Sequence, residues 1–203
     1  MNSIALSLPT GEGVVIDIGT GDGTFVYQSA RQNPTKFYIG VDSSPRPLEK
    51  VSEKIHRSRK KGGVPNALFV QAAVESLPHA LDGVADEVHV HFPWGSLLRA
   101  VATGDRPVLQ NLRRICAPQA VLEVVIGLDP ERDRVEMQRL GVQPLNCEYI
   151  DSVLAPLYRG AGFEVIKRGV LAAEDWTKIN TAWAKRLSGG AGRTVSYLIA
   201  SAE

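Results

Sequence analysis

A short apolar strand that runs into a series of glycines constrains this chain most. Residues 14–18 read VVIDI, a β-branched run typical of a buried parallel strand, and residues 19–23 continue as GTGDG. Glycines are needed where the backbone turns tightly after a strand and where a nucleoside lies against the main chain without a Cβ in the way. The segment therefore predicts a strand, a ligand-binding loop and a helix in immediate succession.

The rest of the chain repeats this alternation of strands and helices. Further strand-like runs lie at residues 37–41, 67–71, 87–92, 121–126, 163–171 and 194–200, and helical patterns lie at 23–33, 45–60, 105–116 and 150–161. The pattern predicts an α/β fold, a doubly wound, Rossmann-like sheet of seven mostly parallel strands that binds ligands at the strands' carboxyl ends. A connection at 173–192 that ends in Ser188-Gly189-Gly190-Ala191-Gly192 suits an antiparallel last strand.

Length and composition fit one globular domain over residues 1–203, with a short lead at 1–13. The chain has 203 residues, 44% of them hydrophobic, which is enough for a full core. Two cysteines are too few for a disulfide framework, and the four histidines (His56, His79, His89 and His91) show no metal-binding spacing, so we expect no metal site. The start MNSIALSLPTGEG has no basic leader and no run approaches the ~20 apolar residues of a membrane span, so we expect a cytoplasmic protein without membrane association.

The net charge of +1 conceals two basic segments. Residues 45–61 carry seven basic and two acidic side chains, net +5, and residues 176–202 carry four basic side chains and no acid. Because the total is +1, the remaining residues must sum to −8. The sequence therefore predicts an acidic body with two basic patches, which leaves a nucleic-acid partner open.

An acid follows the glycine loop at the spacing of a ribose-binding residue. The second strand run ends at Asp42, roughly 20 residues after the loop, where a carboxylate can accept both ribose hydroxyls. The loop differs from the dehydrogenase GxGxxG because its third glycine comes one residue earlier, and Asp17 suits a cationic amino-acid group better than a pyrophosphate. A dinucleotide site and a purely structural turn are the alternatives.

Residues 17–23 are similar to motif I of the class I S-adenosylmethionine-dependent methyltransferases. This resemblance implies that the methionine end of the cofactor lies at Asp17, Gly19, Thr20 and Gly21 and that Asp42 holds the ribose. The third strand run leads into Val74 and Glu75, which are placed to contact the adenine. Glu75 has an alternative role as an acid at a helix N-terminus, where carboxylates are favoured.

A tryptophan follows the fourth strand run, in the segment HFPWGSLLR at residues 91–99. In class I methyltransferases this strand end faces the transferred methyl group, so Trp94 between Pro93 and Gly95 indicates a flat aromatic acceptor. The segment has no cysteine or carboxylate, which argues against pyrimidine methyltransferases that attack through a thiolate. Trp183 is a second candidate, because two indoles could hold an extruded base by stacking. Burial in the core is the alternative for both, and we expect it for Trp176.

Five segments resemble the aminoglycoside-resistance methyltransferases that modify N1 of adenine 1408 in 16S rRNA. They are DIGTGDG at 17–23, ARQNP at 30–34, KGGVPN at 61–66, FPWGSLLR at 92–99 and WAKRL at 183–187. The resemblance covers nearly the whole chain from residue 14 onward, and the two tryptophan segments are its most specific parts.

The resemblance implies a site for a flipped adenine on the 30S subunit. Trp94 and Trp183 would sandwich the base, with Pro93 and Ser96 shaping the pocket and Thr181 beside it; His91 and Ser96 would also lie at the cofactor. The rRNA backbone would be contacted by basic residues: Lys54, Arg57, Arg59, Lys60, Lys61, Lys185, Arg186 and Arg193. The implied cofactor is S-adenosylmethionine, its product S-adenosylhomocysteine, and the enzyme is expected to act as a monomer.

Two departures from the family and three rivals accompany this interpretation. The lead before motif I is shorter than in the family, and His91 stands where an apolar residue is usual. A tRNA guanine-N7 methyltransferase also carries a Phe-Pro strand end, but its FPDPWPK signature is not matched here. The other rivals are a non-catalytic rRNA-binding module, which has no need of Asp42 or paired indoles, and a dehydrogenase, which the loop spacing disfavours.

Overall fold

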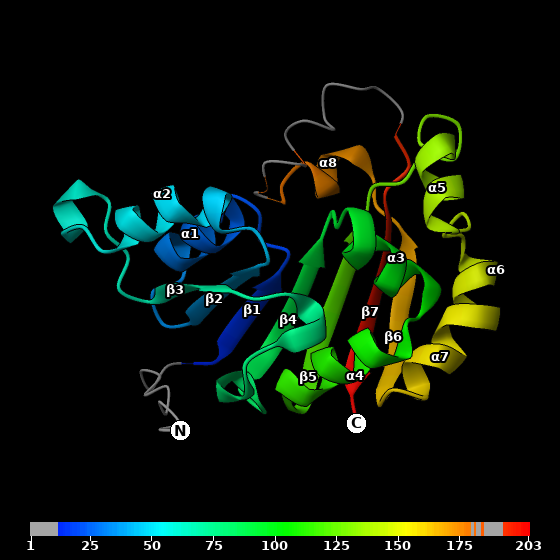
Figure 1. Ribbon diagram of the computed structural model, residues 1–203, viewed down its shortest axis with the longest axis horizontal. Helices are drawn as coiled ribbons and strands as arrows, with labels where there is room; N and C mark the ends of the chain where they lie inside the picture. Colours follow the sequence, from blue (N-terminus) through cyan, green and yellow to red (C-terminus); the bar gives the residue numbers. More distant parts are fainter. Residues whose placement is uncertain (1–11, 180, 182–183, 185–192) are drawn as a thin grey trace.

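A computed structural model describes residues 12–179, 181, 184 and 193–203. Its centre is a seven-stranded sheet in the order β3-β2-β1-β4-β5-β7-β6. The strands are β1 (Val14–Ile18), β2 (Phe37–Asp42), β3 (Ala67–Gln71), β4 (Ala85–His91), β5 (Cys116–Ile126), β6 (Phe163–Val170) and β7 (Ser196–Ala202). Strands β1 to β5 pair in parallel, and β7 is antiparallel to both β5 and β6 (Figure 1). The predicted doubly wound sheet with an antiparallel last strand is confirmed.

Helices cover both faces of this sheet because successive strand residues point to opposite sides. On one face, α1 (Thr24–Gln32) and α2 (Pro45–Ile55) pack on Val15 and Tyr38. On the other face, α3 (Gly95–Thr103), α4 (Arg106–Ile115) and α7 (Ala155–Arg159) pack on Ile16, Val88 and Leu122. The remaining helical segments are short: η1 (Arg59–Lys61), η2 (Val74–Ser76), η3 (His79–Leu81), α5 (Arg134–Leu140), α6 (Cys147–Tyr149), the π-helical turn η4 (Ile150–Leu154) and α8 (Ala173–Trp176).

The structure differs from the expected elements in several places. Helices α3 and α5 are not among the predicted elements, since Gly95 begins α3 and four of the seven residues of α5 are polar or charged. Strand β5 begins at Cys116 rather than at the predicted Val121, because the chain passes directly from α4 into the sheet. Gln119, with a φ of 62°, interrupts the regular strand pattern of this first part of β5. The expected helix at 45–60 ends at Ile55 and resumes as η1. Of the described helices, none has the length and apolar character needed to cross a bilayer.

Candidate functional site

The glycine loop after β1 folds back against the end of β2. Gly19, Gly21 and Gly23 all have positive φ (76°, 58° and 68°), which favours glycine. The backbone N–H groups of Gly19 and Thr20 donate to the Val41 carbonyl oxygen at 2.8 and 3.0 Å. A Cβ on Gly19 would lie 2.6 Å from Leu97 Cδ2, so a larger residue would require the end of the Leu97 side chain to move as well as a strained backbone. The loop is thereby fixed against the carboxyl ends of two central strands.

A cavity of ≈ 240 Å³ opens at this edge of the sheet. Its walls come from the ends of β1, β2 and β3 and the start of α3: Ile18, Gly19, Val41, Asp42, Ser43, Ala72, Ala73, Val74, Glu75, Trp94, Ser96 and Leu97. Six of the residues expected at the cofactor or the acceptor base are therefore brought together in one cavity. The carboxyl ends of parallel strands at the point where the strand order reverses are the usual ligand site of such sheets.

Asp17, Thr20 and Gly21 lie in or under the loop and do not line this cavity. Asp17 is buried, and burial raises the pKa of its carboxyl above the ordinary value while the nearby His91 charge acts in the opposite sense. Thr20 Oγ1 is buried and makes no hydrogen bond of regular geometry among the described residues, although the hydroxyl lies close enough to the Asp17 carboxyl to act against the rise in its pKa. A carboxyl group and a buried hydroxyl beside a glycine cradle fit a ligand that brings both a cationic and a hydrogen-bonding group.

Trp94 stands at a distorted turn between β4 and α3. Phe92 has a φ of 48°, rare for a residue other than glycine, and its N–H donates to the Val125 carbonyl at 2.7 Å. Pro93 and Gly95, with a φ of 59°, complete the turn. Trp94 occupies the N-cap position of α3 and is 47% exposed, which makes it an exposed large aromatic side chain at the mouth of the cavity.

A second cavity, of ≈ 170 Å³, lies on the other side of Trp94. It is lined by Phe92, Pro93, Trp94, Leu98, Ile126, Gly127, Leu128, Asp133 and Arg193. Arg193 donates to the Gly127 carbonyl at 2.7 Å and pairs with Asp133 at 2.5 Å. Trp94 therefore borders two adjoining cavities, one under the glycine loop and one with a guanidinium at its wall.

The chain matches a family model over residues 4–202, and the description of that family is 16S rRNA (adenine(1408)-N(1))-methyltransferase. This chain belongs to that family. Similar curated proteins carry the same description: one from Streptoalloteichus hindustanus is 37% identical over 89% of this chain and 82% of its own length. Another, from Escherichia coli, is 35% identical over 89% of this chain and 83% of its own length.

Solved structures of such methyltransferases share the fold closely. The aminoglycoside resistance methyltransferase NpmB1 superposes with a TM-score of 0.84 at 48% identity, over 96% of this chain and 89% of that one. A mutant enzyme from Catenulisporales acidiphilia, crystallised with the cosubstrate S-adenosylmethionine, gives 0.88 at 35% identity, over 95% and 87% of the two chains. By contrast, a tRNA (guanine-N(7)-)-methyltransferase from Xanthomonas oryzae pv. oryzae matches 39% of this chain and 31% of its own length. The expected family, enzyme class and cofactor are confirmed, and the tRNA alternative is not favoured.

Five of the basic residues expected to contact rRNA lie between the end of α2 and η1. Lys54 is near the end of α2 with its Nζ 3.8 Å from the centre of the Tyr27 ring, whereas Arg57, Arg59, Lys60 and Lys61 are exposed on and before η1. These five residues, here called the η1 basic segment, extend to one side of the sheet beyond β3 (Figure 1). Arg193 differs from them because it is already paired with Asp133.

The connection between β6 and β7 is described in part. Thr181 accepts a hydrogen bond from the Ala184 N–H at 2.9 Å through its hydroxyl, while Trp183, Lys185 and Arg186 lie outside the described residues. Trp176 is 3% exposed and meets the Phe92 ring edge-on at a centroid distance of 6.2 Å, as expected for a core residue. The start of this connection therefore packs directly under the turn that carries Trp94.

His91 is buried but does not line the cofactor cavity. Its Nε2 lies 2.6 Å from Glu123 Oε1, and its ring contacts Phe25 on the side of the sheet that α1 covers. Asp133, Glu123 and the pairing of His89 with His91 are not among the features predicted from the sequence. A signal existed for the histidines, because two histidines separated by one residue on a strand share a face, whereas single acids in other elements carry no motif.

Proposed function

We propose that this methyltransferase transfers a methyl group from S-adenosylmethionine to N1 of adenine 1408 in 16S rRNA. One observation carries the proposal: Trp94 borders both the cavity under the glycine loop and the adjoining cavity with Arg193. This is where an acceptor base must meet the methyl donor. The match to the family over residues 4–202 supports the choice of base and position.

The chain holds the donor through residues at the ends of three strands. Asp42 accepts the ribose hydroxyls, and Val74 and Glu75 lie along the cavity wall where the adenine ring fits. Asp17 and Thr20 lie under the loop at the methionine end, with Gly19 and Gly21 giving the main chain its close approach. When bound, S-adenosylmethionine supplies an electrophilic methyl group on a sulfonium.

The acceptor base needs orientation rather than activation. Adenine N1 has a free in-plane lone pair at neutral pH, so no general base has to remove a proton before attack. Trp94 stacks against the flipped adenine together with Trp183, and Pro93, Ser96 and Thr181 limit where the ring can lie. Holding N1 in line with the methyl group is a proximity effect that can supply several kcal/mol. The methylated base is cationic, and the indole faces stabilise that charge.

Basic residues position the enzyme on the folded rRNA of the 30S subunit. The η1 basic segment together with Lys185, Arg186 and Arg193 contacts phosphates, which fixes orientation without reading sequence. In this proposal the protein acts as a monomer in the cytoplasm, and the modified subunit resists aminoglycosides, as the description of NpmB1 indicates for that enzyme.

Mass spectrometry of the modified nucleoside tests this function. The protein is incubated with 30S subunits and S-adenosylmethionine carrying a labelled methyl group, and the rRNA is digested to nucleosides. We expect labelled 1-methyladenosine. Labelled 7-methylguanosine would instead assign the chain to the guanine-N7 chemistry, and cofactor binding without any label in RNA would indicate a non-catalytic rRNA-binding module.

A further inference from the structure

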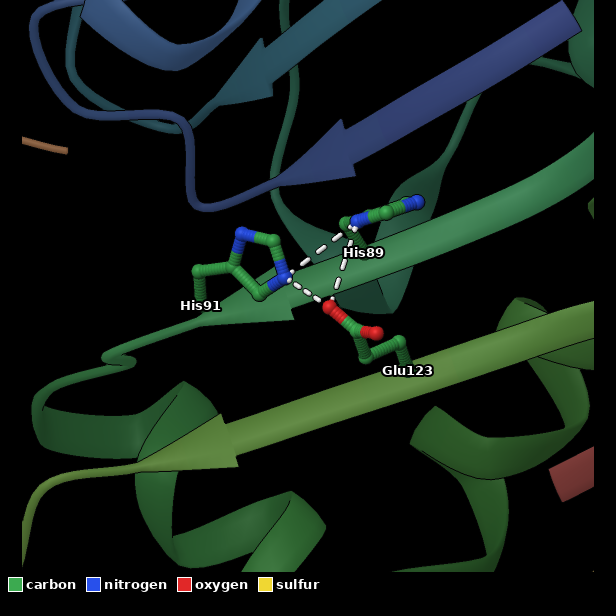
Figure 2. Close-up of side chains that lie close together, drawn as sticks. All are labelled: His89, His91 and Glu123. Atoms are coloured by element: carbon green, nitrogen blue, oxygen red, sulfur yellow. Dashed lines mark hydrogen bonds and ion pairs between the residues drawn. The ribbon is translucent and has the colours of Figure 1, made fainter. Parts of the chain in front are cut away.

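Three side chains of types that can ligate a metal, His89, His91 and Glu123, lie close together (Figure 2), on the face of the sheet where Phe25 of α1 packs. His91 Nε2 lies 2.6 Å from Glu123 Oε1 and 3.2 Å from His89 Nδ1, and His89 Nδ1 lies 3.6 Å from the same Glu123 oxygen. We propose that His89, His91 and Glu123 bind one divalent transition-metal ion, with Zn²⁺ as the best-suited ion. This site lies outside the cavities proposed for methyl transfer, although His91 leads into the turn that carries Trp94, and the proposal does not rest on the function proposed above.

Strand geometry brings the three residues together. His89 and His91 are two residues apart on β4, so their side chains emerge on the same face. Glu123 lies opposite His89 in the parallel pairing of β4 with β5. The backbone of two neighbouring central strands therefore fixes all three positions, as expected of a preorganised site.

Each of the three side chains can direct a lone pair at the centre of the cluster. Glu87 Oε2 lies 3.1 Å from His89 Nε2, so a His89 ring that donates from Nε2 to this carboxylate leaves the lone pair of Nδ1 directed at the cluster. Glu123 contributes a carboxylate oxygen, which lies 2.6 Å from His91 Nε2 and 3.6 Å from His89 Nδ1. A divalent cation between these atoms accepts one lone pair from each of them.

The donor set matches the coordination chemistry of zinc. Two imidazoles and one carboxylate are the three protein ligands of a common type of zinc site that keeps its fourth position open. With Zn–N and Zn–O bonds of about 2.0–2.2 Å, tetrahedral ligand atoms are about 3.3 Å apart. The observed separations of 2.6, 3.2 and 3.6 Å surround that value, so a shift of a few tenths of an ångström per side chain accommodates the ion.

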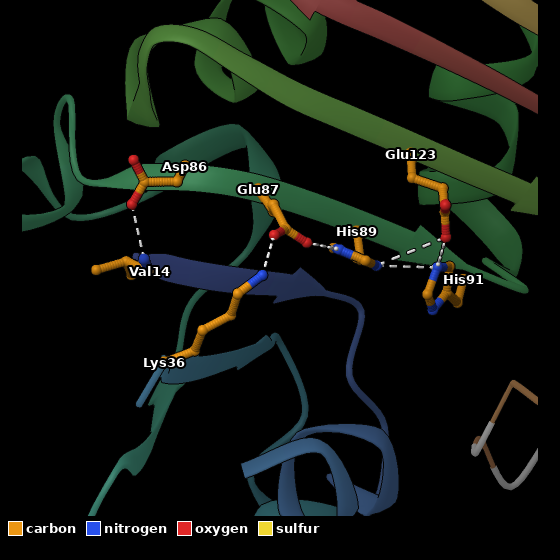
Figure 3. A network of polar contacts seen from close by, with 7 residues as sticks. All are labelled: Val14, Lys36, Asp86, Glu87, His89, His91 and Glu123. Atoms are coloured by element: carbon orange, nitrogen blue, oxygen red, sulfur yellow. Dashed lines mark hydrogen bonds and ion pairs between the residues drawn. The ribbon is translucent and has the colours of Figure 1, made fainter. Parts of the chain in front are cut away.

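Outer contacts orient His89, whereas the Nδ1 of His91 is buried without a hydrogen-bond partner among the described residues (Figure 3). Glu87 contacts His89 through one carboxylate oxygen and Lys36 Nζ at 2.5 Å through the other, the carboxylate–histidine contact that typically orients metal ligands. The Phe25 ring contacts both imidazoles, at centroid distances of 5.4 and 4.9 Å. His91 is nearly inaccessible, whereas the Glu123 side chain is 33% exposed, so an ion and its fourth ligand can enter from that side.

Metal binding at this position affects the turn that carries Trp94. His91 is the last residue of β4 and precedes the strained Phe92, so an ion that links His91 to Glu123 of β5 fixes the strand end from which the turn departs. The ion therefore has a structural and positioning role, and no chemical step of methyl transfer passes through it.

Direct metal titration tests the site in the full chain. Protein stripped with a chelator is titrated with Zn²⁺ by calorimetry and with Co²⁺ by visible absorption. We expect one ion per chain and a Co²⁺ spectrum typical of mixed nitrogen and oxygen ligation. His89→Gln and Glu123→Gln should each weaken Zn²⁺ binding at least about 100-fold, and Glu87→Gln, which removes an outer contact, about 10- to 100-fold.

Three controls make the result decisive. His79→Gln removes an exposed histidine that pairs with Asp82, and Cys147→Ser removes the exposed thiol; neither should change the affinity. Circular dichroism without metal establishes whether each variant is folded. If His89→Gln does not fold, Glu123→Gln, which changes a side chain at the accessible side of the cluster, tests the site in its place. The proposal is overturned if stripped protein binds neither ion, if Glu123→Gln binds as tightly as the wild type, or if Cys147→Ser abolishes binding.

Discussion

Asp42 Oδ2 accepts a hydrogen bond from the Gly21 backbone N–H at 2.9 Å, so the acid at the end of β2 is attached to the glycine loop that follows β1. The other oxygen of Asp42 accepts from the Ser44 N–H, also at 2.9 Å. These contacts hold the carboxylate at the wall of the cofactor cavity in a fixed orientation. One side chain thus shapes the loop and presents charge to the ligand.

We expect Asp42→Asn to weaken S-adenosylmethionine binding about 10- to 100-fold. A hydrogen bond to a charged group contributes about 1.5–3 kcal/mol, and 1.4 kcal/mol corresponds to a factor of ten. Calorimetric titration measures the change. Asp22→Asn is the matched control, because Asp22 is an exposed acid of the same loop that does not line the cavity. Equal losses in the two variants would contradict the assignment of Asp42 to the ribose.

Trp176→Ala should lower the free energy of unfolding by about 3–5 kcal/mol, as large-to-small changes of buried aromatic residues do. Trp176 is buried against Phe92, Val125 and Val195, so its removal leaves a cavity under the turn. Urea denaturation at neutral pH measures the loss. Trp94→Ala provides the comparison: its exposed side chain should cost less than about 1 kcal/mol, and a larger loss would mean that Trp94 is a packing residue.

The double variant Lys60→Ala, Lys61→Ala should bind 30S subunits more weakly and with a smaller salt dependence. Removing one lysine–phosphate interaction reduces the slope of log affinity against log salt concentration by about 0.7–0.9. Binding measured at several salt concentrations gives that slope. Arg159→Ala is the control. Arg159 is an exposed cation that precedes β6, at the amino edge of the sheet, and it pairs with Glu164 of that strand. An unchanged slope in the double variant would exclude the η1 basic segment from the rRNA interface.

The two cysteines should differ sharply in reactivity. Burial raises the pKa of Cys116 to about 12, so its thiol stays protonated in the folded protein, whereas Cys147 is exposed. A thiol reagent should label one cysteine in the native protein and both in urea. Between pH 9 and 12 the unfolded thiol ionises while the folded one does not, so this group lowers stability as pH rises. Cys116→Ala should lack that part of the alkaline loss, and labelling of two thiols in the native protein would contradict the burial.

Local patterns were sufficient to predict most of the fold. The bounds of β1 and β3 agree with the apolar runs at 14–18 and 67–71: β1 is a buried central strand with a continuous β-branched run, and β3, at the edge of the sheet, is a short apolar segment. The antiparallel last strand followed from the long connection and its terminal glycines. Helix α5 could not be predicted because a single apolar pair at helical spacing, Met137 and Leu140, is too short a pattern to identify a helix, and the segment is recognised only from the packing of both residues on the core.

The candidate site was predictable where one motif determines one position. Asp42, Val74 and Glu75 follow strand ends, so their presence at one cavity could be inferred from the sequence alone. The Asp133–Arg193 pair and the contact of Glu123 with the two histidines depend on residues more than 30 positions apart. Such contacts arise from strand order and register, which no single segment encodes.

Primer extension on 16S rRNA is the most direct test of the account, because a methyl group on N1 blocks base pairing and stops reverse transcription. With 30S subunits, S-adenosylmethionine and wild-type protein, we expect a stop at adenine 1408. Trp94→Ala should reduce that stop about 5- to 150-fold, since loss of stacking removes about 1–3 kcal/mol, while its cofactor affinity stays within a few-fold. A stop at another nucleotide, or an undiminished stop at adenine 1408 with Trp94→Ala, would contradict the central claim.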